Sequence, residues 1–188
     1  HHTYDPGNGV VHLGDGTDRS AQAIGAITRT LVGGGGPSIG TPEAEGQPVA
    51  KVTVSNLSGN TRAPDGTTYF ANWGREHGIF RVGADGKVRR YAGRRSTATD
   101  IDKRLEEEGP PSGDGGPAID AVLGGNPIAM SAGPDGSLYF VITPGGASYP
   151  RGLIRKVAPD GTISTVAGSM DTSVGHQDGV PGRQTAVT

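Results

Sequence analysis

Short runs of β-type residues, in which apolar side chains gather, follow one another along residues 57–168, and polar turns containing glycine separate them. Short runs bounded by such turns are typical of β-strands. Asp-Gly, usually preceded by Pro or Ala, stands between the first and second runs and between the third and fourth runs, and it supplies the positive φ of a tight hairpin. Each group of four is therefore predicted to form an antiparallel meander. The predicted strands are 57–62, 67–72, 78–83, 87–92, 127–132, 137–142, 153–158 and 162–167.

The two predicted meanders are copies of one repeat. Residues 63–70 (APDGTTYF) match residues 133–140 (GPDGSLYF), and residues 79–93 match residues 153–168. A weaker copy of the second element opens the chain at residues 5–14. Radial repetition of four-stranded meanders gives a β-propeller, in which each meander is one blade. We therefore expect an all-β chain with two complete blades and partial blades at both ends.

This expectation divides the chain into four segments. Residues 1–14 are the last strands of a preceding blade, residues 15–93 and 94–168 are complete blades with long insertions, and residues 169–188 are the entry loop of a third blade. Two blades cannot close a ring. The remaining blades are expected either from a longer chain, which we favour, or from other subunits.

Composition supports short strands rather than helices. With 34 Gly and 14 Pro among 188 residues, a helical bundle is excluded. Such a low content of large aliphatic residues is usual in disordered segments. A net charge of only −2 and 25 Val and Ile against 7 Leu oppose that interpretation, because β-branched residues favour strands.

Several classes of partner are unexpected from the composition. No run reaches the roughly 18 apolar residues of a membrane helix, so we expect no membrane insertion. The 17 basic and 19 acidic residues are interspersed, which argues against binding nucleic acid. The absence of Cys excludes disulfides and thiolate metal sites. It permits the extracellular or secreted location that we expect, since many exported bacterial proteins also lack Cys.

The second copy resembles an NHL-type β-propeller repeat. The first copy departs from this pattern, with residues 46–49 (GQPV) in place of GGPA and Asn56-Leu57 in place of Asn-Pro. Residues 177–182 (QDGVPG) are similar to the entry loop of a further blade. The motifs of the second copy that carry the resemblance are, in order, residues 112–118 (SGDGGPA), 126–127 (NP), 134–140 (PDGSLYF), 154–157 (IRKV) and 164–168 (STVAG).

The resemblance implies a ring of about six blades. Many NHL propellers are interaction modules, bacterial teneurin-like and toxin-associated propellers are similar, and a minority of the family are lyases or hydrolases. The resemblance also implies that Asp114 fixes a turn between blades. The expected function is therefore a non-catalytic scaffold that binds a protein or small ligand.

Long connections between the strands are predicted to lie on one face of the propeller. In a four-stranded meander, the connection between strands two and three emerges on the same face as the connection to the next blade. These are the connections of variable length, whereas the others are minimal Asp-Gly turns. Long loops on a rigid scaffold usually carry the binding residues, so we place the function on this long-loop face.

Two loops of this face contain the candidate binding residues. Trp and Arg dominate binding hot spots, and both loops offer an aromatic residue and an Arg. The alternative is structural, with Trp73 covering the edge of the blade and Glu76 paired with Arg75 in solvent. The candidate residues are Trp73, Arg75, Glu76 and His77 in one loop, and Tyr149 and Arg151 in the other.

A short helix is also predicted on this face, at residues 99–108, with Thr99 as its N-cap. Its single apolar stripe contains Ile101 and Leu105. The stripe favours packing onto the propeller over docking of a partner.

We expect no catalytic residue, cofactor or metal. No Gly-Lys-Ser or Gly-Lys-Thr follows the glycine run, and no Gly-x-Ser-x-Gly occurs. Only His77 and His176 fall on the long-loop face, whereas a zinc centre usually needs three protein ligands. Two alternatives stay open: a metal-dependent propeller lyase or hydrolase, completed by residues of other blades, and a self-assembling two-blade structural protein.

Overall fold

The structure of the 188-residue chain is a computed structural model, and it forms two compact units, His1–Leu31 and Val32–Thr188. The first unit contains a three-stranded antiparallel sheet in the order β1 (Thr3–Asp5), β2 (Val10–His12), β3 (Asp18–Ser20). The strands expected in residues 1–14 belong to this unit. The residues that the structure describes are 3–5, 10–12, 18–20, 34–73, 77–95, 109–144, 152–171 and 173–187.

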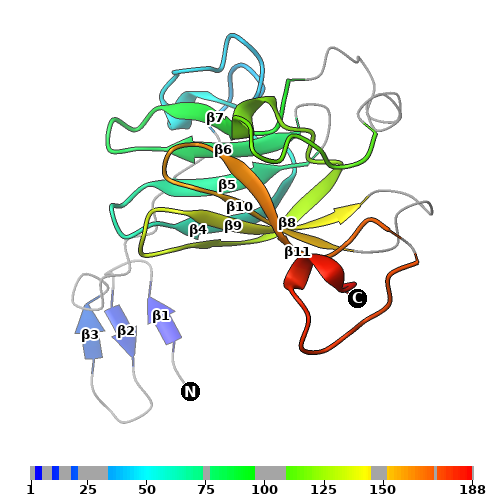
Figure 1. Ribbon diagram of the computed structural model, residues 1–188. Coiled ribbons are helices and arrows are strands. Elements are labelled where there is room, and N and C mark those ends of the chain that lie inside the picture. The colour runs from blue at the N-terminus through cyan, green and yellow to red at the C-terminus, as the bar shows by residue number, and fades with distance from the viewer. Residues whose placement is uncertain are drawn as a thin grey trace. The chain divides into compact units, whose positions relative to one another are not determined.

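The second unit contains two four-stranded antiparallel sheets, each a meander of consecutive strands (Figure 1). The eight strands predicted from the sequence are confirmed, with every boundary within two residues of the prediction. The first sheet consists of β4 (Leu57–Arg62), β5 (Thr68–Asn72), β6 (Gly78–Val82) and β7 (Val88–Ala92). The second sheet consists of β8 (Gly125–Ala132), β9 (Leu138–Pro144), β10 (Leu153–Val157) and β11 (Ile163–Ala167).

The helical structure in the described residues is limited to three single turns of 3-10 helix, η1 (Val49–Lys51), η2 (Ala118–Asp120) and η3 (Gly182–Gln184). In this part of the chain no helix has the length and apolar character needed to cross a membrane. The helix predicted at residues 99–108 lies outside the described residues.

The Asp-Gly turns close hairpins as predicted. At the first turn, the Asp65 carboxylate accepts the backbone N–H of Thr67 at 2.8 Å, and Gly66 has a φ of 88°. Asx turns of this kind preorganise the chain reversal. The same aspartate bond recurs at the other three turns, at Asp85, Asp135 and Asp160.

The two sheets repeat each other in backbone detail. The pairing of β4 with β5 shifts register between Leu57 and Gly59, and the pairing of β8 with β9 shifts at the equivalent Pro127 and Ala129. The third and fourth strands of each sheet share a second register shift, next to Ile79 in the first sheet and Ile154 in the second. Equivalent bulges show that the sequence repeat is also a structural repeat.

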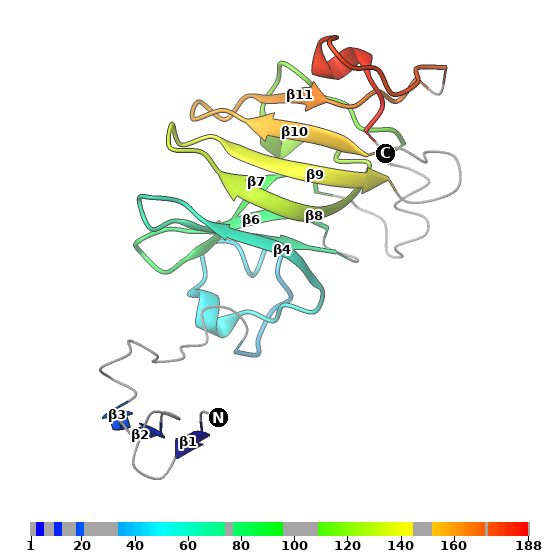
Figure 2. The same ribbon diagram turned by 90° about the horizontal axis from the view of Figure 1, so that it is seen from below.

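The two sheets pack face to face. The face of the first sheet that contacts the second sheet is called its downstream face, and the opposing face of the second sheet is called its upstream face. Figure 2 shows the sheets stacked with β4 beside β8. At this closest approach, a Cβ on Gly59 would lie 3.0 Å from the carbonyl oxygen of Ile128. One buried cluster joins Tyr69, Ala71, Ile79 and Ala92 of the first sheet to Leu138, Phe140, Ile142, Leu153, Val157 and Ile163 of the second.

The loop that precedes each sheet is called its entry loop. It is hydrogen-bonded to the hairpin between the third and fourth strands of that sheet. In the first repeat, the N–H of Val49 donates to the carbonyl of Gly86 at 2.9 Å. In the second repeat, Ala118 donates to Gly161 at the same distance. The entry loop of the second sheet also contacts the first sheet, because Gly93 donates to the carbonyl of Ala118 at 2.9 Å. This loop therefore bridges both sheets.

A buried arginine holds the second entry loop. Arg155 on β10 is 0% exposed, and its Nη1 donates to the carbonyl of Val122 at 2.9 Å. Its Nη2 donates to the carbonyl of Ser112 at 3.1 Å and to Asp114 Oδ1 at 2.6 Å. Asp114 also accepts the backbone N–H of Thr165 at 2.8 Å. The aspartate and the arginine thus tie the loop to the third and fourth strands of its sheet.

This network holds Asp114 ionised. Partial burial, the largest single influence, raises the pKa of Asp114, but hydrogen bonds from Thr165 and Arg155 together outweigh it and hold the pKa below its ordinary value of 3.8. The contribution of Asp114 to stability is therefore complete above about pH 4 and is lost as pH falls through its folded-state pKa.

Replacing Asp114 with Asn is expected to destabilise the chain at neutral pH and to flatten its loss of stability in acid. Urea denaturation across a pH series measures this effect, and the difference in unfolding free energy between wild type and variant should shrink below about pH 4. Asp178, whose side chain is 99% exposed, provides the Asp178→Asn control, which should follow the wild-type profile. A difference that stays constant in acid would contradict the role of the Asp114 charge.

Candidate functional site

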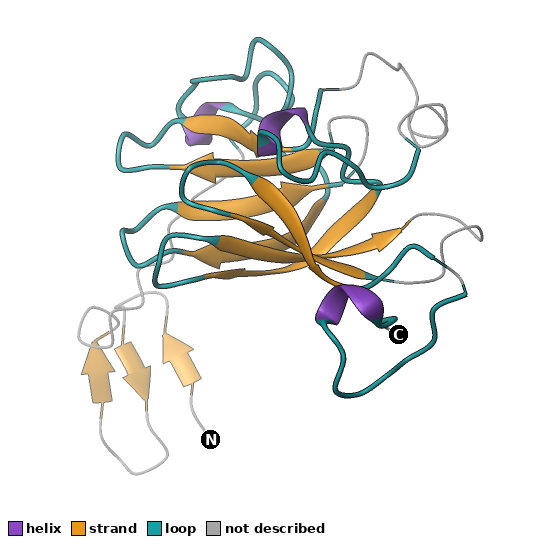
Figure 3. Cartoon of the chain, in the orientation of Figure 1, coloured by secondary structure: helices purple, strands orange, loops and turns teal. Residues whose placement is uncertain are grey.

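The strand ends from which the long connections start lie at one end of the two sheets, as the order of the strands predicts. The four Asp-Gly hairpins project from the opposite end (Figure 3). The β5–β6 connection, the β9–β10 connection and the segment from β7 to the second entry loop all start at the long-loop end.

The structure describes two of the six predicted binding residues. The rings of Trp73 and His77 meet edge to face, with centroids 5.0 Å apart. His77 is 3% exposed, whereas Trp73 is partly exposed. This contact supports a structural role for Trp73 at the edge of the sheet and leaves part of its surface accessible. The four other predicted residues, Arg75, Glu76, Tyr149 and Arg151, lie outside the described residues.

A groove rich in arginine lies at the long-loop end of the first sheet. It has a volume of about 500 Å³. Arg90 belongs to β7, Arg94 and Arg95 follow that strand, and the turn η2 provides the opposite wall. Three arginines and two acidic residues contribute to its lining. The residues that line this arginine groove are Glu45, Arg90, Arg94, Arg95, Ile119 and Asp120.

Several contacts hold Arg90 in place in the wall of the arginine groove. The guanidinium of Arg90 lies 4.9 Å from the ring centroid of Phe80. Its Nη1 donates to the carbonyls of His77 at 2.7 Å and Gly93 at 3.1 Å. The carboxylate of Glu45 accepts the backbone N–H of Arg90 at 3.2 Å. One carboxylate of the groove is thereby engaged with the backbone.

Arg94 and Arg95 provide the accessible charge. Both side chains are exposed. The backbone N–H of Arg94 donates to the carbonyl of Ala121 at 2.8 Å, so the entry loop positions the start of this arginine pair. Guanidinium groups at the protein surface suit the recognition of a carboxylate or phosphate.

The second repeat has a groove at the equivalent place, and its lining contains one arginine, Arg183, instead of three. Its volume is about 350 Å³. Thr165, Ser169 and Met170 stand at the positions of Arg90, Arg94 and Arg95. The arginines are therefore not required by the repeat itself. The sequence reasoning missed them, although RRYAGRR at residues 89–95 was a visible signal.

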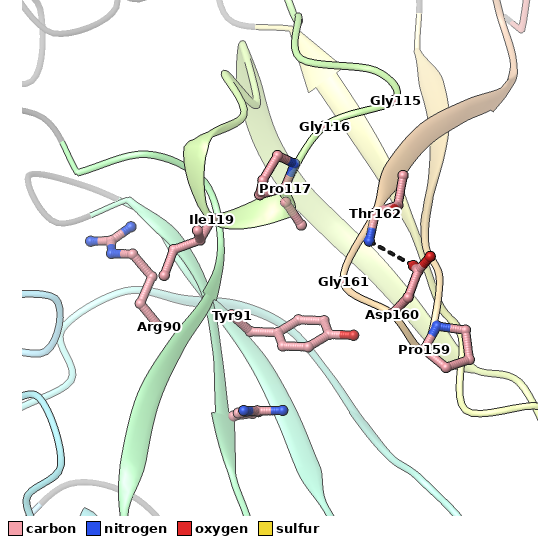
Figure 4. A pocket seen from close by; sticks show the side chains of 12 residues that line it. Arg90, Tyr91, Gly115, Gly116, Pro117, Ile119, Pro159, Asp160, Gly161 and Thr162 are labelled. Atoms are coloured by element: carbon pink, nitrogen blue, oxygen red, sulfur yellow. Dashed lines mark hydrogen bonds between the residues drawn. The ribbon is translucent and has the colours of Figure 1, made fainter.

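A second groove opens on the other side of Ile119, with a volume of about 460 Å³. Figure 4 shows the ring of Tyr91 extending across it toward the turn at residues 159–162. Burial, followed by the neighbouring Tyr69, raises the pKa of Tyr91 to about 12, so the phenol stays neutral. The guanidinium of Arg81 lies 5.4 Å from the Tyr91 ring centroid. This groove combines polar and apolar lining and adjoins the arginine groove through Arg90 and Ile119.

No group of three or more His, Asp or Glu side chains within the described ranges could hold a metal ion. His77 is buried in the first sheet, whereas His176 is exposed and lies 3.4 Å from Asp178. Neither a scan against protein-family models nor a search of curated proteins finds a match for this chain.

Proposed function

We propose that this chain is part of a β-propeller scaffold similar to NHL propellers, and that its arginine groove binds an acidic segment of a protein partner without catalysis. The two stacked meanders support the propeller. The observation that carries the binding function is the set of three arginines, Arg90, Arg94 and Arg95, around one groove at the long-loop end.

Guanidinium groups suit this task because each presents a planar fork of donors to a carboxylate. Glu45 and Asp120 line the groove beside the three arginines, and Glu45 is already bonded to the backbone of Arg90. The chain as a whole carries a net charge of −2. The attraction is therefore local, and salt should weaken it.

The adjoining groove, which contains the Tyr91 ring, indicates the shape of the partner. Ile119 separates the two grooves and is 48% exposed. An extended peptide that crosses Ile119 would place a carboxylate among the arginines and an apolar side chain beside Tyr91. Trp73 and the untested candidates Arg75, Glu76, Tyr149 and Arg151 would contact a larger partner from the same end.

Changing Arg94 to Ser and Arg95 to Met tests the proposal, because the second repeat has these residues at the same positions. We expect the double variant to bind a fluorescein-labelled hexaglutamate peptide at least about tenfold more weakly, since each charge-assisted hydrogen bond contributes roughly 1.5 to 3 kcal/mol. Fluorescence anisotropy at low and high salt measures the dissociation constant.

The matched control is the variant Arg62→Gln with Arg89→Ser, which removes the same charge outside the arginine groove. It should bind the peptide nearly as tightly as wild type. Equal losses in both variants would show attraction to net charge alone, and unchanged binding in the Arg94→Ser, Arg95→Met variant would refute the site.

A further inference from the structure

The groove that contains the ring of Tyr91, called the Tyr91 groove, is formed where the two repeats meet. Arg81 and Tyr91 come from the first sheet, and the turn at residues 159–162 comes from the second. The second entry loop holds this turn, because the backbone N–H of Ala118 donates to the carbonyl of Gly161 at 2.9 Å. The groove is therefore already formed without a ligand, as most binding sites for small groups are.

Two contacts fix the ring of Tyr91 at the border of this groove. The guanidinium of Arg81 lies over the ring, 5.4 Å from its centroid. The ring of Tyr69 meets it edge to face, with centroids 4.8 Å apart. Tyr91 itself stays partly exposed, and Figure 4 shows its ring reaching toward the turn of the second sheet. The groove thus contains an accessible aromatic surface that is held in place.

The repeat does not require this aromatic surface. In the second sheet, Val166 stands at the position of Tyr91. Lys156 stands at the position of Arg81, and its Nζ lies 3.7 Å from the carboxylate of Asp135. Within the described residues, the exposed Arg81 side chain makes no hydrogen bond or ion pair. The Tyr91 groove therefore has a guanidinium group whose donors the fold does not use.

We propose that the Tyr91 groove binds an aromatic side chain of the acidic protein partner. This inference rests on the proposed function, because the Tyr91 groove and the arginine groove share Arg90 and Ile119 in their linings. A peptide with a carboxylate in the arginine groove brings a neighbouring residue past Ile119, which is 48% exposed. That residue enters the Tyr91 groove and contributes to the choice of partner.

The chemistry of the Tyr91 groove favours an aromatic ring over other side chains. The face of the Tyr91 ring carries negative partial charge, which repels a carboxylate and attracts the positive edge of a second ring. A bound ring would also offer its own face to Arg81, because guanidinium groups stack on aromatic rings. An aliphatic side chain would cover Arg81 without offering it an interaction. Pro117, Pro159 and Ile119 are exposed and provide apolar contacts on the other walls.

Two peptides of equal length and charge test this inference. Each carries fluorescein and has four glutamates on either side of a central residue, which is phenylalanine in one peptide and leucine in the other. The central position serves either direction of the bound peptide. We expect the wild type to bind the phenylalanine peptide roughly fivefold more tightly in fluorescence anisotropy, because aromatic and cation–π contacts add to the burial of apolar area.

Variants of the groove show where the preference arises. Tyr91→Val, which introduces the residue of the second repeat, should remove the preference and leave the affinity for the leucine peptide nearly unchanged. Arg81→Gln, which keeps the ring, should reduce the preference. Tyr139→Val is the matched control and should keep it. Tyr139 is also partly exposed, and its ring centroid lies 5.5 Å from Lys156 Nζ, but it does not line the Tyr91 groove.

The possible failures of the inference and of the proposed function differ. Equal affinities of the wild type for the two peptides would overturn the inference, while binding of the leucine peptide would still support the arginine groove. A preference that persists in Tyr91→Val would place the aromatic residue elsewhere and would also overturn the inference. Binding of neither peptide would refute the proposed function, and the inference with it.

Discussion

Replacing Arg155 with Met is expected to lower the free energy of unfolding by about 3 kcal/mol, because breaking a buried ion pair leaves its partners without compensation. Met fills much of the arginine volume, so lost packing is a minor part of the effect. The carbonyls of Val122 and Ser112 lose their donors, and Asp114 loses its cation. Urea denaturation followed by circular dichroism measures the change.

The matched control for Arg155 is Arg89. Its ion pair with Asp85 has the same 2.6 Å separation, but the two side chains are 39% and 44% exposed. Solvent screens such a pair, so Arg89→Met should leave the denaturation midpoint nearly unchanged. Equal losses in the two variants would show that burial of the Arg155 network does not determine its contribution.

Replacing Gly168 with Ala is expected to destabilise the chain by roughly 2 to 4 kcal/mol, through backbone strain and a steric clash. Gly168 follows β11 with a φ of 90°. A Cβ at this position would overlap the carbonyl oxygen of Gly152 and lie 3.0 Å from Leu153 Cδ2. The end of β11 would have to move away from β10, and the contact of Gly168 with η3 would be weakened.

Gly161→Ala separates the two causes. Gly161 has a φ of 86°, but a Cβ there would meet nothing within 4 Å. This variant should therefore lose only the cost of the left-handed backbone, about 1 to 2 kcal/mol. Thermal and urea denaturation of both variants give the comparison. If Gly168→Ala lost no more stability than Gly161→Ala, the close approach to Gly152 would be unimportant.

The arginine groove and the Arg155 network are two uses of the same positions. Phe80 occupies in the first sheet the place of Arg155 in the second, and Arg90 occupies the place of Thr165. In both repeats an entry-loop carboxylate, Glu45 or Asp114, accepts the N–H of the fourth strand. The bond that both repeats share fixes the entry loop. The strand that carries the arginine then determines its role: Arg155 on the third strand binds the entry loop, whereas Arg90 on the fourth strand lines a groove.

The strands and turns were determined by the sequence alone, because local interactions fix them. The aromatic and aliphatic residues of 67–72 and 137–142 favour extended backbone, and the Asp65 carboxylate accepts the N–H two residues ahead. The repeat then confirmed each assignment at a second place in the chain. The order of the strands also determined that the long connections share one end of the sheets.

Only the tertiary structure decided which side chains gather and which are buried. One groove brings together Glu45, Arg90 and Asp120, which are distant in sequence. They line it because both entry loops lie beside β7. The sequence places Arg155 in a strand, but only the structure shows that it is buried and bonded to the carbonyl of a loop residue more than thirty positions away. His77 is buried against Trp73. The residues of a strand predict its extended backbone, whereas charge pairing and burial depend on what the rest of the chain places against each of its faces.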